Sequence, residues 1–110
     1  MSLVTSACLY VQHASHEERT KLLEPLPFDS RGQSFREVPW QASGGTKGMH
    51  CDVFIAGFNY VLPDDLVRHV GEALGPHRNA VLIVDMEDDP DVFVFGDDVT
   101  FRGSGRREAA

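Results

Sequence analysis

Soft metal ligands are the first candidates for chemistry in this sequence. The relevant side chains are Cys8, His13, His16, His50 and Cys51. A zinc site needs about four thiolates and imidazoles that converge from two segments. The sequence has no CxxC or HxxxH pair to begin such a site, and adjacent residues such as His50 and Cys51 point to opposite faces of a strand. We therefore predict that the chain binds no metal and no cofactor, and that both thiols are packed as small apolar groups.

Cys51 could act as a nucleophile if a histidine accepted its proton. It follows a glycine-rich stretch, residues 43–48, whose backbone amides could hold an anion. This stretch does not match the Walker phosphate loop, because that motif lies between a strand and a helix whereas this one precedes a strand. The alternative function is accordingly a small enzyme or a small-molecule sensor with a site near the 43–51 loop, formed by His13, His50 and Cys51.

The charge distribution is asymmetric. Residues 1–50 have five basic and five acidic side chains, whereas residues 51–110 have five basic and twelve acidic ones, so the second half carries the whole formal charge of −7. Nucleic-acid binding requires a basic face, and this distribution argues against direct DNA or RNA binding. The same charge would attract a basic protein.

The acidic cluster lies in the turns of an expected C-terminal hairpin region. No EF-hand is present, because the glycine position of that loop, counted from Asp85, holds Pro90. We expect these carboxylates to be solvated and to form a surface for a basic partner. Trp40 is a further binding candidate, because a single tryptophan beside an edge segment and a glycine-rich loop can line a pocket or an interface. The predicted binding residues are Trp40, Glu87, Asp88, Asp89, Asp91, Asp97 and Asp98.

Hydrophobic patterns predict the elements that would position these side chains. Short apolar runs predict strands at 7–11, 34–40, 51–61, 80–84, 92–95 and 99–101. Pro39 cannot donate to a ladder, so the second of these strands is expected at an edge. The run 51–61 is apolar on both faces, which is typical of a strand that is covered on both sides or packed under helices.

Two helices are expected between these strands. Ser15 and Glu18 form a capping-box sequence, which predicts a helix over 16–24 that ends before Pro25. A second helix is predicted over 64–74, because Pro63 and two acidic residues suit a first turn and an apolar stripe follows.

The resulting order, β-α-β-β-α-β with an extra C-terminal hairpin strand, predicts a two-layer α+β sandwich of ferredoxin-like order. A mixed sheet in a rearranged α/β layer is the alternative. The length of 110 residues predicts a single domain over 1–102 and a flexible tail over 103–110. This order is shared by proteins of many functions and names none of them.

The function that these observations favour is a small acidic, noncatalytic binding or regulatory protein of the inhibitor or immunity type. Its partner would be a basic protein, engaged through the acidic hairpin region. Edge strands in a small sandwich also favour a homodimer. The sequence has no run of about 18 apolar residues and no basic segment followed by an apolar one at its start, so we expect neither a membrane span nor secretion. We expect a bacterial-type cytoplasmic location with reduced thiols.

Overall fold

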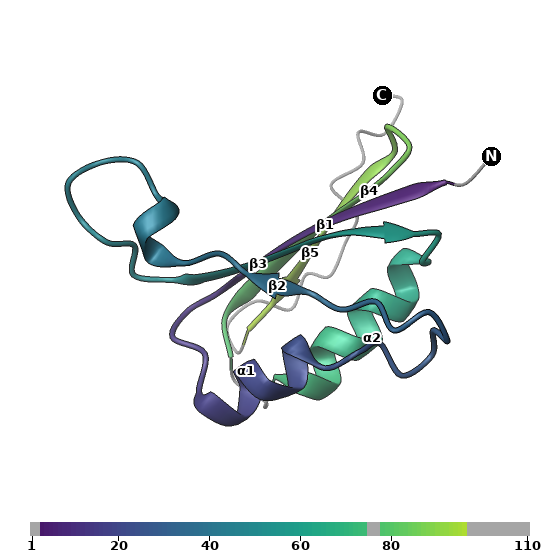
Figure 1. Ribbon diagram of the computed structural model, residues 1–110, viewed down its shortest axis with the longest axis horizontal. Coiled ribbons are helices and arrows are strands. Elements are labelled where there is room, and N and C mark those ends of the chain that lie inside the picture. The colour runs from purple at the N-terminus through teal and green to yellow at the C-terminus, as the bar shows by residue number, and fades with distance from the viewer. Residues whose placement is uncertain (1–2, 75–77, 97–110) are drawn as a thin grey trace.

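In the part of the chain that the structure describes, a five-stranded antiparallel sheet carries two helices on one of its faces (Figure 1). The computed structural model describes residues 3–74 and 78–96. The strands are β1 (Val4–Val11), β2 (Arg36–Glu37), β3 (Asp52–Asn59), β4 (Ala80–Met86) and β5 (Pro90–Phe95). The helices are α1 (His16–Leu23) and α2 (Pro63–Ala73), and a 3-10 turn, η1, covers Trp40–Ala42. The predicted two-layer α+β architecture is confirmed.

The strands lie in the order β2-β3-β1-β4-β5. The central strand β1 pairs antiparallel with both β3 and β4, so Cys8 lies between Ile55 and Ile83. The expected strand at 34–40 is an edge strand of only two residues, because the chain turns into η1 directly after Pro39. The expected hairpin strand at 92–95 is part of β5, which pairs with β4.

Both helices begin as their sequences predict. The Ser15 side chain accepts a hydrogen bond from the Glu18 backbone amide, and the Glu18 carboxylate accepts one from the Ser15 amide, which completes the capping box. Pro63 occupies the first turn of α2, where its missing N–H costs no hydrogen bond. The two helices bury their apolar residues against the sheet.

The core lies between the helices and one face of the sheet. Along β1 the burial alternates, and the buried residues point to the helices. The largest buried side chains are Phe35, Phe54 and Phe58, and Leu9 is fully buried beside them. Of the two alternatives for 51–61, packing under helices agrees with the structure and cover on both sides does not, because Ile55 of β3 is 45% exposed on the face that the helices do not cover. We call this uncovered side of the sheet the open face.

Three predictions lie outside the described residues: the strand at 99–101, the tail at 103–110 and the carboxylates of Asp97 and Asp98. None of the helices in the described ranges has the length and apolar character that a membrane crossing requires.

Candidate binding groove

A groove of about 660 Å³ lies where the 38–51 loop meets the sheet. We call it the Trp40 groove. It is lined by Tyr10, Gly48, Met49, the segment 37–43 and the segment 51–53. Three of its large apolar side chains are exposed, at 66% for Trp40, 44% for Met49 and 39% for Tyr10. In Figure 1 this loop projects beyond the ends of the strands.

Two hydrogen bonds to the Trp40 carbonyl fix the position of the Trp40 backbone. The Ser43 amide and hydroxyl both donate to the Trp40 carbonyl, at 3.1 and 2.8 Å, which closes the 3-10 turn. A side chain at Gly48 would meet the indole ring at 3.6 Å, so the indole lies directly over the Gly48 backbone. The returning arm of the loop therefore supports the ring, although most of the ring's surface stays exposed.

Arg19 forms ion pairs with two residues that line the groove, Glu37 and Asp52. The Arg19 guanidinium of α1 lies 3.0 Å from Glu37 and 3.2 Å from Asp52, and Asp52 also accepts the Ala14 amide at 2.9 Å. The Val38 amide donates to the Val53 carbonyl, which extends the β2–β3 pairing to the groove. Because both carboxylates in the lining are paired with Arg19, the largest exposed side chains that remain for a ligand are those of Trp40, Met49 and Tyr10.

The structure brings only one of the three residues of the predicted alternative site into this groove. Cys51 is half-buried in its lining, whereas His13 and His50 are exposed and do not line it. Cys8 lies in the middle of β1 and pairs with Ile55 rather than with residues near Cys51. Burial raises the pKa of the Cys8 thiol, which keeps the thiol protonated near neutral pH and slows its reactions. Within 3–74 and 78–96 no three His, Cys, Asp or Glu side chains are placed to hold a metal ion.

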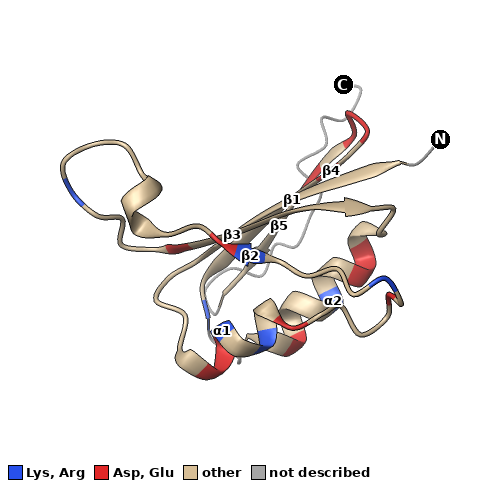
Figure 2. Cartoon of the chain, viewed as in Figure 1, with Lys and Arg blue, Asp and Glu red and all other residues tan. Residues whose placement is uncertain are grey.

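The acidic residues lie at the other end of the sheet. Glu87, Asp88 and Asp89 are exposed in the β4–β5 turn, which we call the acidic turn (Figure 2). Trp40 and the acidic turn thus belong to two separate surfaces. Asp91 needs a correction: it was expected on the exposed surface, but it is only 7% exposed, because β5 begins at Pro90 and places Asp91 on the face toward the helices.

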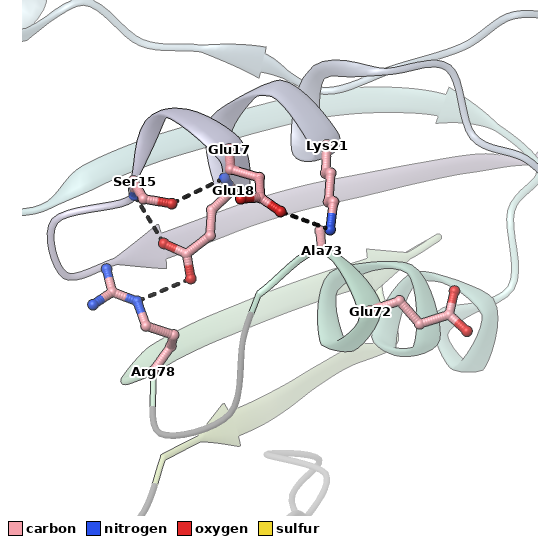
Figure 3. Close-up of a pocket in the computed structure, with 7 residues that line it drawn as sticks. All are labelled: Ser15, Glu17, Glu18, Lys21, Glu72, Ala73 and Arg78. Atoms are coloured by element: carbon pink, nitrogen blue, oxygen red, sulfur yellow. Dashed lines mark hydrogen bonds and ion pairs between the residues drawn. The ribbon is translucent and has the colours of Figure 1, made fainter.

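A second hollow, of about 370 Å³, lies between the two helices and Arg78 (Figure 3). Four of its five charged side chains are paired: Glu18 caps α1 and lies 3.1 Å from the Arg78 guanidinium, and Lys21 pairs with Glu17 at 3.4 Å. Arg78 also donates to the backbone carbonyls of Gln12 and His13. This hollow therefore holds α1 to the sheet and leaves few polar groups for a ligand.

Sequence reasoning missed Tyr10, Met49 and the apolar open face. Tyr10 lies in a run whose residues are apolar on both faces, and such a run does not tell which face is covered. The register of β1 and β3 shows which face of β1 is open, because Cys8 pairs with Ile55 and Tyr10 pairs with Val53. This register cannot be read from a local sequence pattern.

No family model, no curated protein and no solved structure matches this chain.

Proposed function

We propose that this protein is a small noncatalytic binding protein, and that its ligand site is the Trp40 groove. The observation that carries the proposal is the exposed indole of Trp40, which is held over Gly48 at the mouth of a groove of about 660 Å³. Grooves of about 300–1,000 Å³ with aromatic lining are typical of small-molecule sites. Aromatic rings lose little conformational entropy on binding and offer flat apolar area. The ligand class is therefore a small molecule with a planar aromatic ring.

Noncatalytic binding fits this lining better than catalysis. The thiol of Cys51 is the only nucleophile in the groove that the sequence singled out, and neither His13 nor His50 lines the groove beside it. The carboxylates of Glu37 and Asp52 are both engaged in ion pairs with Arg19. An enzyme or sensor that uses His13, His50 and Cys51 together stays a prediction, and so does a cytoplasmic location.

The basic-protein partner also stays a prediction. The acidic turn presents Glu87, Asp88 and Asp89 at exposed positions, but this turn lies away from the Trp40 groove. A partner that binds there would not cover the groove, so the two proposals can be tested separately.

We also propose that the fold has the ferredoxin-like order. A ferredoxin-like order is supported by the chain order from β1 to β4, with one helix after β1 and one after β3, and by the β2-β3-β1-β4 neighbours in the sheet. In this order β5 is an addition at the edge.

The test uses Trp40, the only tryptophan of the chain, as its own reporter. Titration with 1-anilinonaphthalene-8-sulfonate should quench the tryptophan emission saturably, with one site per chain. Met49→Ser should weaken this binding about tenfold, because it removes apolar contact area from the groove. Leu62→Ser is the matched control: Leu62 is exposed to a similar extent, 48% against 44%, but lies at the start of α2. Quenching that does not saturate, or equal affinities in the two variants, would contradict the proposal.

A further inference from the structure

The open face of the sheet is apolar across four strands. Antiparallel register places the side chains of paired residues next to one another on the same face. One row contains Val53, Tyr10, Val81 and Val94, and the next row contains Ile55, Cys8, Ile83 and Val92. The third row is polar and contains Gly57, Ser6, Asp85 and Pro90. Two adjacent apolar rows thus cross the sheet beside one polar row.

This apolar surface is large and accessible. Ile55 is 45% exposed and Ile83 37%. Tyr10, which is 39% exposed, and Val53 belong both to this surface and to the lining of the Trp40 groove. Figure 1 shows both helices on the other side of the sheet, so no helix of the described ranges covers these rows. Contiguous apolar patches of this kind in a protein usually mark a surface that is covered by a partner.

We infer that a second copy of this chain covers the open face, so that two sheets pack face to face in a symmetric dimer. The area is sufficient. Four strands about 4.8 Å apart, with six to eight residues of about 3.4 Å each, present on the order of 500 Å² per copy. The pair would then bury on the order of 1,000 Å², which is where specific protein interfaces begin. An area at this lower limit predicts a reversible dimer.

Charge also favours a second copy over a basic partner. The charged strand residues on the open face are Arg36 at the β2 side and Asp85 on β4, and their charges cancel. Although the chain as a whole has a formal charge of −7, the described part of the open face has no row of like charges. Two copies can therefore approach one another on this face. A two-fold axis parallel to the strands would bring Arg36 of each copy over the β4–β5 side of the other, where Asp85 lies.

The experiment compares two lysine variants by light scattering coupled to size-exclusion chromatography and by sedimentation equilibrium. The unmodified protein should give a mass that rises with concentration toward twice 12.2 kDa. Ile55→Lys should weaken the dimer at least about a hundredfold, because the two-fold symmetry places two lysines in one apolar interface. Leu62→Lys adds the same charge at a residue of similar exposure outside the open face and should leave the dissociation constant unchanged.

Circular dichroism checks that both variants fold, and Ile83→Lys replaces Ile55→Lys if the latter does not. The rate at which a thiol reagent labels Cys8, relative to Cys51 of the same molecule, should fall as the protein becomes dimeric. A chain that is monomeric at every concentration would overturn the inference, whether Cys8 is open to the reagent or is covered by another segment. A dimer that Ile55→Lys and Leu62→Lys affect equally would also overturn it, since the interface would then lie elsewhere.

Discussion

His69 is the residue whose chemistry the fold changes most. It lies on α2 with 7% of its surface exposed, and its ring stacks on Phe35 at 6.3 Å between centroids with an interplanar angle of 6°. Phe28 contacts it edge-on at 6.4 Å. Burial lowers the pKa of His69 below its ordinary value, although a hydrogen bond to the Leu22 backbone and the charges of Glu72 and Glu24 act in the opposite direction. His69 is therefore a neutral aromatic core residue.

This burial predicts a pH dependence of stability. The unfolded chain takes up a proton at His69 as the pH falls through its ordinary pKa of 6.5, whereas the native state takes it up only at lower pH. The contribution of His69 to the free energy of unfolding should therefore be fully present above this pH. Below it, the free energy of unfolding should decrease by no more than about 1.4 kcal/mol per pH unit. Urea denaturation between about pH 7.5 and pH 5.5 measures this slope.

His69→Phe should remove most of the slope, because the ring remains on Phe35 but no longer titrates. His16→Phe is the matched control at an exposed position of α1 and should keep the slope. If His69→Phe retains the same pH dependence, another group is responsible for it.

Among the elements, the β4–β5 turn has a local sequence that does not suit its backbone geometry. Glu87 and Asp88 both have positive φ angles, 54° and 68°, between Met86 and Asp89, whose backbones are hydrogen-bonded. Two-residue hairpins need this geometry, and asparagine followed by glycine suits it best. Non-glycine residues in this region are strained, and glutamate and aspartate are less suited to it than glycine.

Asp88→Gly should therefore raise the free energy of unfolding by about 0.5–1 kcal/mol. The matched control is Asp89→Gly, one residue further along the same turn. Asp89 is not among the residues with positive φ, so glycine there adds freedom to the unfolded chain and should lower the stability by a similar amount. Chemical denaturation of both variants gives the comparison, and equal effects of the same sign would contradict the conformational explanation.

Local signals predicted the elements better than they predicted their surroundings. The capping box at Ser15 and the proline at the start of α2 fixed the helix starts, because both act through nearest neighbours. The ends of β2 were not predictable in the same way, since Arg36–Glu37 form a strand only where β3 offers a partner. Asp91 shows the same limit: its type favours a turn, but the hairpin register places it in a strand.

The candidate groove was only half predictable for a related reason. Trp40 and Cys51 stand near a glycine-rich loop, and that proximity in sequence was enough to single them out. Tyr10 joins them only because β1 and β3 are neighbours in the sheet and Tyr10 pairs with Val53. Long-range pairing of this kind leaves no trace in a local pattern.

At the scale of the whole molecule, the sheet has one packed face and one open face. Neighbouring residues of β1 point to opposite faces and differ in burial. Leu9 is fully buried toward the helices, whereas Cys8 lies half-buried on the open face. Removing side-chain atoms from the packed face leaves a cavity, while the open face can lose a sulfur atom with little change in packing.

Leu9→Ala should lower the free energy of unfolding by about 3 kcal/mol, within the usual range for a buried leucine. Cys8→Ala should lower it by less than about 1 kcal/mol. Both are measured by urea denaturation of dilute protein, where the proposed dimer is dissociated, so that only contacts within one chain contribute. Similar losses for the two variants would mean that the open face is packed within the single chain, and the two-layer description would then fail for the molecule in solution. A loss confined to Leu9 would show that the stability of one chain comes from the helix-covered face, which leaves the open face available for binding.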